Sequence, residues 1–296
     1  MQATYISPLT DFGFKKLFGE EPNKDLLVSF LNTLLPERHQ IQDLQYSKNE
    51  YQGISPLDRK AIFDLNCVSP SGERFVIELQ KVKQAYFKDR SVYYSSFAIQ
   101  EQAKRGDWDY RLSTVYTIGI LDFLMDDHEQ DVLYHAQLKD QKNRPFFDKL
   151  HFIYVVLPRF QKTLPELVSL QDKWLYTFRH LHELEQMPPH LNEAVFRKVF
   201  AIAELATYNP KERQSYEDSL KYYRDLKNSN DTAWQEGMVE GIGIGRAEGL
   251  EAGREEGRKA ERLEIARHLL DVLDDPTIAH KTGLSVAEIR QLRQPG

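Results

Sequence analysis

The sequence has one cysteine, no long apolar run and no leader-like start. The single cysteine, Cys67, excludes a framework of disulfide bonds. No stretch approaches the ~18 consecutive apolar residues that a membrane-spanning helix needs, so we expect no membrane span. The first residues, MQATYISPLTDFGFKK, lack the positive segment and apolar run of a secretory signal. These absences predict a cytoplasmic protein that does not bind a membrane.

Several common site motifs are missing as well. The sequence contains neither a C-x-x-C pair nor a phosphate-binding P-loop. His180 and His182 stand two residues apart in a predicted helix, where their side chains point away from each other, so they do not make a pair of metal ligands. The net charge of −6 argues against a protein that coats nucleic acid by bulk charge, although a local basic strip can still bind it.

The residues that are present predict a globular α/β protein. A chain of 296 residues with 41% hydrophobic residues can build one large core or two domains. Hydrophobic periodicity predicts helices in residues 10–35, 85–108 and 159–205, and strands in residues 40–48, 61–68, 74–82, 113–121, 131–138 and 150–158. The order is therefore helix, three strands, helix and strand, followed by a mixed region.

The C-terminal part has a different composition. Glycines recur every four residues from Gly237 to Gly257, and each costs about 1 kcal/mol against alanine inside a helix. Two interpretations remain open for this segment, a helical arm that self-associates along the glycine seam and a flexible linker. The last residues, with Ala279, Gly283 and Ile289, are helix-turn-helix-like, although a small helical cap that buries its own face would show the same pattern.

Two acidic residues stand on strand-like runs around a predicted hairpin. In residues 61–68 the odd positions are apolar, including Phe63, and leave Asp64 on the opposite face. In residues 74–82 the odd positions are again apolar and leave Glu78 and Gln80 on the other face. If residue 68 pairs with residue 74, then Asp64 pairs with Glu78, and their Cβ atoms lie roughly 5 Å apart.

Two carboxylates that close repel each other unless a cation lies between them. Mg²⁺ suits such a pair because it needs only one or two protein carboxylates, and Mn²⁺ is a possible substitute. A divalent ion held by Asp64 and Glu78 can activate water for phosphodiester cleavage. Gln80 can orient that water or bond the phosphate, but it cannot act as a cation. The alternative is that both acids lie on the solvent-exposed face of a hairpin.

Five segments together resemble a known family. They are TDFGFKKLFG, FDLNC, FVIELQ, RSVYYSSFAIQEQAKRGDWDY and STVYTIGIL, which occur in this order within residues 8–160. The chain resembles the recombination-promoting nuclease / transposase family of the PD-(D/E)XK nuclease superfamily. The resemblance implies a restriction-endonuclease-like core, a mixed sheet flanked by helices in the order αβββαβ, with a helical C-terminal extension.

The resemblance also implies roles for individual residues. Asp64 and Glu78 become metal ligands, and Gln80 stands where many relatives have lysine. Asp11 and Lys15, in the first-helix segment DFGFK, become accessory candidates, and phenylalanine stands at position 63 where the superfamily name leads one to expect proline. Domains are expected at residues 1–210 (nuclease-like), 211–260 (glycine-repeat arm) and 261–296 (helical end).

Local charge favours a polyanionic substrate. Between residues 81 and 111 seven Lys and Arg residues stand against four Asp and Glu residues, in a chain that is acidic overall. Gln102, on the predicted helix 85–108, is a further candidate for the metal site. The basic residues expected to bind nucleic acid are Lys81, Lys83, Lys88 and Arg90.

These observations predict a Mg²⁺-dependent DNA endonuclease with a role in recombination or mobile-element biology. The glycine-repeat arm would make it a homo-oligomer. Two alternatives remain, an inactive nuclease fold that binds DNA or protein, and an RNase of the same fold.

Overall fold

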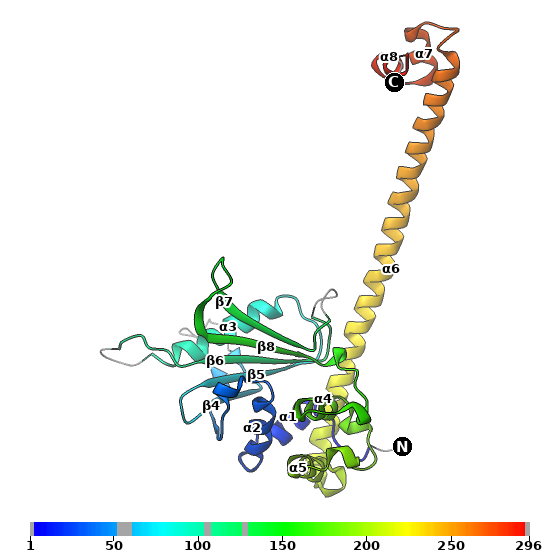
Figure 1. The fold of residues 1–296 in the computed structure, drawn as a ribbon. Helices are drawn as coiled ribbons and strands as arrows, with labels where there is room; N and C mark the ends of the chain where they lie inside the picture. Colours follow the sequence, from blue (N-terminus) through cyan, green and yellow to red (C-terminus); the bar gives the residue numbers. More distant parts are fainter. Residues whose placement is uncertain (1–2, 52–60, 104–107, 126–129, 294–296) are drawn as a thin grey trace. The chain divides into compact units, whose positions relative to one another are not determined.

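The computed structural model describes residues 3–51, 61–103, 108–125 and 130–293 (Figure 1). It contains two compact units, Met1–Asn228 and Ser229–Gly296. Helix α6 (Pro210–Leu269) begins at the predicted boundary at residue 210 and continues past the one predicted at residue 260, and the first compact unit ends within it at Asn228. Among the described helices, none combines the length and the apolar content that crossing a membrane requires.

A six-stranded mixed sheet forms the centre of the first unit. Its strand order is β1-β4-β5-β6-β8-β7, in which β5, β6 and β8 run parallel to one another and the other pairs are antiparallel. A separate two-stranded sheet pairs β2 with β3. The strands are β1 Gln45–Tyr46, β2 Glu50–Tyr51, β3 Ala61–Ile62, β4 Leu65–Val68, β5 Arg74–Gln80, β6 Val115–Leu121, β7 Leu133–Lys139 and β8 Pro145–Val156.

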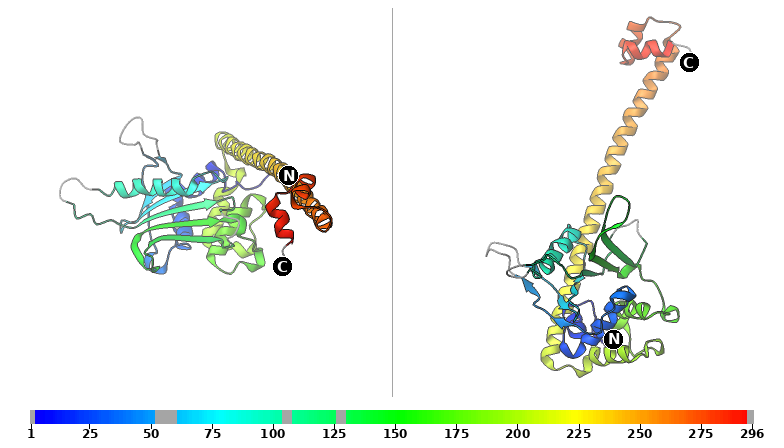
Figure 2. Two further views of the ribbon diagram at one scale, coloured as in Figure 1. Left: turned by 90° about the horizontal axis from the view of Figure 1, so that it is seen from above. Right: turned by 60° about the vertical axis from the view of Figure 1, so that its left-hand side comes forward.

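Helices cover both faces of this sheet (Figures 1 and 2). Besides α6, the helices of the first unit are α1 Asp11–Phe18, α2 Lys24–Asn32, α3 Phe87–Gln100, α4 Leu170–His180 and α5 Ala194–Ala203. Short 3₁₀ helices connect them, at Glu21–Asn23, Glu37–His39, Leu157–Arg159, Leu164–Glu166, Leu181–Glu183, Pro189–Leu191 and Leu205–Thr207. The succession α1, β1, β4, β5, α3, β6 confirms the predicted αβββαβ order.

The period-two alternation of β5 explains how the two layers are built. Phe75, Ile77 and Leu79 pack into the main core with α1, α2, α4 and α5. Val76, the residue between Phe75 and Ile77, packs against α3 on the opposite face of the sheet. The even positions of β5, which include Glu78, therefore face the α3 side of the sheet.

The predicted position of Phe63 was wrong. The alternation placed it on the same face as Leu65, but Phe63 packs on the α3 side, with its ring 5.0 Å from that of Tyr94. The cause is a bend, because residues 63 and 64 belong to no strand and separate β3, which pairs with β2, from β4. A bend of this kind resets the alternation.

The first part of α6 is bound to the N-terminal segment. The hydroxyl of Tyr216 accepts the backbone N–H of Ser7 at 3.1 Å, and the Ser219 hydroxyl accepts that of Phe12 at 3.1 Å. Tyr216 is almost fully buried in the main core. Residues 210–228 of α6 therefore belong to the folded core of the first unit.

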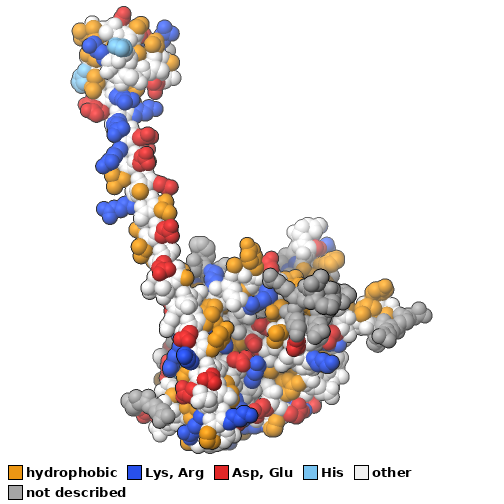
Figure 3. Space-filling view, turned by 180° about the vertical axis from the view of Figure 1, so that it is seen from behind, with side chains coloured by type: hydrophobic (Ala, Val, Ile, Leu, Met, Phe, Trp, Pro, Cys, Tyr) orange, Lys and Arg blue, Asp and Glu red, His pale blue; other side chains and the backbone are white. Residues whose placement is uncertain are grey.

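The second unit contains the rest of α6 with helices α7 (Asp275–Thr282) and α8 (Val286–Arg293). The glycines of the four-residue repeat are helical, and a Cβ placed on any of them would meet no described atom within 4 Å apart from the neighbouring residues and the backbone of the same helix. Basic, acidic and apolar side chains alternate along this stretch (Figure 3). Gly283 ends α7 at φ +70°, a left-handed conformation that favours glycine.

The end of the second unit buries a small apolar core of its own. Its fully or nearly fully buried members are Ala266, Ile278, Leu284 and Ile289. Arg293, the last residue of α8, donates to Asp275 at 2.8 Å and to the carbonyl of Leu270 at 2.6 Å. Arg290 lies 3.8 Å from the same aspartate. The basic residues of α8 thus stabilise this unit from within.

Candidate active site

Asp64 and Glu78 come from neighbouring segments and exchange hydrogen bonds. The predicted pairing of residue 68 with residue 74 is confirmed, and Leu65, the first residue of β4, pairs with Ile77. Asp64 therefore stands opposite Glu78. The backbone N–H of Leu79 donates to Oδ2 of Asp64 at 2.6 Å, and the backbone N–H of Asp64 donates to Oε1 of Glu78 at 3.3 Å. Each carboxylate accepts a bond from the segment that carries the other.

Asn49 holds the bend that positions Asp64. Its Nδ2 donates to the carbonyl oxygen of Asp64 at 3.2 Å, and its Oδ1 accepts the backbone N–H of Asn66 at 3.1 Å. Its backbone carbonyl accepts the N–H of Phe63 at 2.8 Å. Because β4 begins only at Leu65, it offers no backbone carbonyl to the N–H of Leu79. The Asp64 carboxylate accepts this N–H instead.

The electrostatics of the pair favour a cation. Burial, reinforced by the neighbouring Asp64 carboxylate, raises the pKa of Glu78 to about 8, against an opposing effect of Arg90. Burial also raises the pKa of Asp64, and Asp11 adds to this, while the hydrogen bond from Leu79 and the charges of nearby lysines oppose it. Both shifts mean that two ionised carboxylates are costly here without a positive charge.

The donor set fits a hard divalent ion with few protein ligands. No Lys or Arg of the described residues forms an ion pair with Asp64 or Glu78. Within the same residues, no three His, Cys, Asp or Glu side chains are grouped so that they could hold a metal. Mg²⁺ needs only one or two carboxylates and keeps several waters, which fits this pair, whereas a structural zinc site requires more side chains.

Gln80 and Arg90 lie on the α3 side of the pair. Nε2 of Gln80 donates to Oε2 of Glu78 at 3.2 Å, as expected for side chains two residues apart on one strand face. Arg90 donates to Gln84 at 2.6 Å, and its guanidinium lies 5.8 Å from the ring centroid of Tyr94. The positive charge of Arg90 opposes the rise in the pKa of Glu78.

Asp11 and Lys15 lie on the α1 side. They form an exposed ion pair at 2.9 Å. They act on the pKa of Asp64 in opposite directions, Asp11 raising it and Lys15 lowering it, so both lie near this carboxylate. With Asn49 and Leu65, which flank Asp64, they line a cavity of about 390 Å³. The two accessory candidates therefore border the site without hydrogen-bonding to the carboxylate pair.

Helix α6 and the end of β6 complete this edge of the sheet. The hydroxyl of Tyr223 donates to Oδ2 of Asp122 at 2.5 Å, and Nζ of Lys227 donates to the same oxygen at 3.1 Å. The backbone N–H of Asp122 donates to the carbonyl oxygen of Gln80 at 2.9 Å. The ring of Tyr222, the residue before Tyr223 on α6, lies 5.6 Å from Nζ of Lys81.

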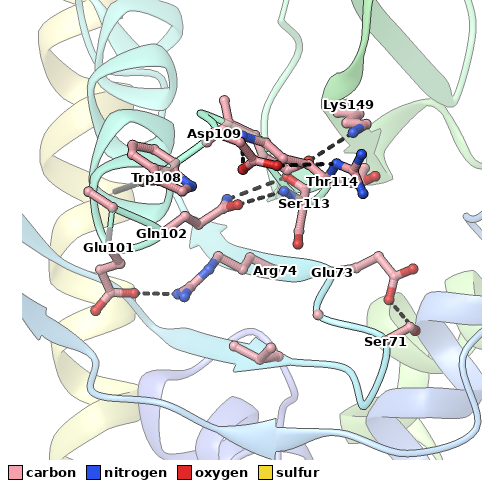
Figure 4. Close-up of a pocket in the computed structure, with 15 residues that line it drawn as sticks. Ser71, Glu73, Arg74, Glu101, Gln102, Trp108, Asp109, Ser113, Thr114 and Lys149 are labelled. Atoms are coloured by element: carbon pink, nitrogen blue, oxygen red, sulfur yellow. Dashed lines mark hydrogen bonds and ion pairs between the residues drawn. The ribbon is translucent and has the colours of Figure 1, made fainter. Parts of the chain in front are cut away.

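Gln102 is not brought to the carboxylate pair. Its Oε1 accepts the backbone N–H of Ser113 at 2.6 Å, and its Nε2 donates to the carbonyl of Ala98 at 3.2 Å. It lines a cavity of about 770 Å³ together with Arg74, the first residue of β5 (Figure 4). Gln102 lies beyond Gln100, the last residue of α3, whereas Arg90 lies near the start of this helix, about 15 Å of helix rise before its end. The prediction placed Gln102 within the helix and near the metal site, and the structure brings it to Ser113 instead.

The other predicted basic residues are divided. Lys81 and Arg90 lie near the carboxylates, as their effects on Asp64 and Glu78 indicate. Lys83 and Lys88 are exposed on the surface after β5 and at the start of α3. Lys104 and Arg105, which contributed to the predicted basic strip, lie outside the described residues.

Comparison with known proteins identifies the family. The model of a family described as PD-(D/E)XK nuclease family transposase matches residues 8–233. The chain belongs to this family. No curated protein and no solved structure matches the chain. The mixed sheet flanked by helices is the restriction-endonuclease-like α/β fold of PD-(D/E)XK nucleases, and membership of this family indicates a nuclease role.

Three residues around the carboxylate pair were not predicted from the sequence as parts of the site. Asn49 holds the bend at Asp64, Tyr94 supports Arg90, and Tyr222 packs on Lys81. The helical spacing of four between Arg90 and Tyr94 is a signal that could have linked these two. No spacing marks Asn49 or Tyr222, because each reaches the site through contacts distant in sequence.

Proposed function

We propose that this protein is a metal-dependent DNA endonuclease that hydrolyses phosphodiester bonds. The observation that carries the proposal is the convergence of the Asp64 and Glu78 carboxylates, each hydrogen-bonded to the other's segment. Family membership supports the nuclease class, and the raised pKa of both acids supports a bound cation. A role in recombination or mobile-element biology and a cytoplasmic location are part of the same proposal.

Asp64 and Glu78 would hold Mg²⁺, with Mn²⁺ as a possible substitute. The ion, when bound, would polarise the scissile phosphate and lower the pKa of water beside it. In the hydrolysis a water oxygen bonds to phosphorus and an ester P–O bond breaks, while the water gives up one proton and the leaving oxygen gains one. Gln80, whose amide already reaches Glu78, would orient the attacking water or bond a phosphate oxygen.

Several cations around the pair support a polyanionic substrate. The charge of Lys81 acts on Asp64 and that of Arg90 on Glu78, and Lys83 and Lys88 are exposed nearby along the chain. We assign these four residues to the binding of DNA phosphates. Such contacts set affinity rather than sequence preference.

The direct test is nicking of supercoiled plasmid by purified protein. Nicked circles are expected with Mg²⁺ or Mn²⁺, and an excess of chelator should stop the reaction until metal is restored. Matched duplex DNA and RNA substrates distinguish a DNase from an RNase. If the protein binds DNA but never cuts with either metal, the non-enzymatic adaptor, which the glutamine at position 80 favours, replaces the endonuclease.

We further propose that the protein is a homo-oligomer assembled through the glycine-repeat part of α6. Apolar side chains on this stretch are exposed, among them Trp234, Val239 and Ile242, and its glycines allow a second helix to approach closely. Two chains would bring two single-strand-cutting sites to one duplex. The charged residues along this stretch argue against the alternative that its apolar side chains are buried in a lipid membrane.

Light scattering tests this assembly. The wild type is expected at about twice the chain mass of 34.6 kDa. Leucines at two adjacent seam positions, in the variant Gly241→Leu/Gly245→Leu, should produce monomers, whereas Glu240→Gln on the same helix should not. A monomeric wild type with full nicking activity would contradict the assembly and leave the nuclease proposal standing.

A further inference from the structure

The cavity that Gln102 lines lies at the other end of β5 from the carboxylate pair (Figure 4). Its volume is about 770 Å³, and its lining includes Arg74, the first residue of β5, and the segment 108–114 that leads into β6. Arg74 and Glu78 are both even positions of β5, so their side chains share the α3 face of the sheet. Four strand residues separate them by about 13 Å. A polynucleotide bound at the carboxylate pair can therefore extend to this cavity.

The charged side chains that line this cavity already have partners. The pairs are Arg74 with Glu101 at 2.6 Å, Lys149 with the carbonyl oxygen of Leu112 at 2.9 Å, Glu73 with the hydroxyl of Ser71 at 2.5 Å, and Asp109 with Arg111 at 3.9 Å. A bound anion or metal ion would have to displace one member of such a pair, and the other member would lose its partner. The lining therefore favours an uncharged ligand.

Three neutral polar groups of the lining have no hydrogen-bond partner among the described residues. They are the indole N–H of Trp108 and the hydroxyls of Ser113 and Thr114, and all three residues border the cavity in Figure 4. The indole can only donate a hydrogen bond, whereas each hydroxyl can both donate and accept. The cavity thus offers hydrogen bonds to a ligand that carries donors as well as acceptors.

An aromatic pair stands beside these polar groups. The rings of Trp108 and Tyr110 lie 5.0 Å apart, with their planes inclined at 34°, and Tyr110 is 80% exposed. The backbone of Tyr110 has a φ of +56°, a left-handed conformation that is uncommon for a residue other than glycine. Strained conformations of this kind are concentrated at binding and catalytic sites. Exposed aromatic rings are the surfaces on which proteins stack the bases of single-stranded nucleic acids.

We propose that this cavity binds one unpaired base of the polynucleotide, about four nucleotides from the bond that is cut. A nucleobase is uncharged, has a flat face that stacks on aromatic rings, and carries hydrogen-bond donors and acceptors along its edge. These are the three properties that the lining favours. The separation of about 13 Å along β5 corresponds to about four nucleotides at a rise of ~3.4 Å each.

This inference rests on the proposed nuclease function and specifies its substrate class. In a fully paired duplex the base is stacked and would first have to leave the helix, which costs free energy. A base that is already unpaired, in a gap, a bubble or a single-stranded extension, does not have that cost. The protein should therefore prefer DNA with unpaired bases on one side of the cleavage site.

Binding to a duplex with a central bubble of unpaired bases tests the site without cleavage. Fluorescence anisotropy in calcium should give the full chain a dissociation constant at least about fivefold lower for the bubble than for a fully paired duplex of equal length. Trp108→Ala should reduce this ratio to less than about twofold, whereas Trp108→Phe, which keeps an aromatic ring, should retain most of it. Phe146→Ala, which removes an equally exposed aromatic ring from β8, is the matched control and should keep the wild-type ratio.

The outcomes separate the two proposals. A wild type that binds both duplexes equally well would refute the base-binding site and leave the nuclease proposal to the nicking assay. The site is also refuted if Trp108→Ala keeps the wild-type ratio, which includes the case in which it weakens binding to both duplexes by the same factor. A wild type that never nicks, but prefers the bubble through Trp108, would refute the nuclease proposal and retain the base-binding site.

Discussion

Asp64→Asn is expected to abolish metal-stimulated nicking while DNA binding persists. Loss of a metal ligand removes several kcal/mol of transition-state stabilisation, which corresponds to a fall of about 10³-fold or more in rate. Asparagine retains an oxygen that can accept the N–H of Leu79, so the bend at the end of β4 should survive. The fall should appear in the rate constant for cleavage and not in the dissociation constant for DNA.

The control for this variant is Asp131→Asn, which changes an exposed carboxylate by the same atoms. It should nick like the wild type. Fluorescence anisotropy with a labelled duplex measures binding in parallel, in calcium or without metal, so that cleavage does not interfere. An Asp64→Asn protein that nicks normally and melts normally would remove Asp64 from the site and with it the proposed mechanism.

Glu78→Gln is expected to change stability in opposite directions with and without metal. Without metal, the folded state holds a proton on Glu78 up to about pH 8, whereas the unfolded chain loses it near the ordinary value of 4.5. The unfolded state therefore binds fewer protons between these values, and stability falls as pH rises through this window. Removing the charge should raise the melting temperature at pH 8 by about 3–6 °C and flatten its dependence on pH.

With metal present, the same variant should lack the rise in melting temperature that the wild type shows. An ion that binds only the folded state stabilises it by mass action, so the melting temperature of the wild type should rise with Mg²⁺ or Mn²⁺ concentration. The neutral amide of the variant should largely remove that rise. Differential scanning fluorimetry over a grid of pH and metal concentration measures both effects. A Glu78→Gln protein that is less stable than the wild type at pH 8 without metal would contradict the prediction that the Glu78 charge destabilises the metal-free protein.

The pairing of Asp64 with Glu78 could be predicted because one aligned pair of residues in an antiparallel hairpin fixes the partners of all the others. Once the turn around Gly72 aligns residue 68 with residue 74, every earlier pair follows. The apolar positions of β5 were equally predictable from their period of two. The order of helices and strands followed from periodicity and length, and only the resemblance identified it as a nuclease core.

The surroundings of the pair could not be predicted in the same way. The break at Phe63 depends on pairing of β3 with β2, a contact that no local pattern records. Gln102 is bonded to Ser113, so its place depends on the path of the chain after α3. The position of Lys81 depends on a tyrosine of α6 far along the chain. Local patterns determine which residues share a face, and tertiary contacts determine what lies opposite them.

The hydrogen bonds that α6 makes with the N-terminal segment and with Asp122 set a lower limit on a minimal autonomous fragment. A chain cut at residue 210 would leave the N–H groups of Ser7 and Phe12 without their hydroxyl acceptors. It would also remove both donors to Asp122 and the ring beside Lys81. A self-sufficient nuclease module must therefore include about five turns of α6, to residue 228.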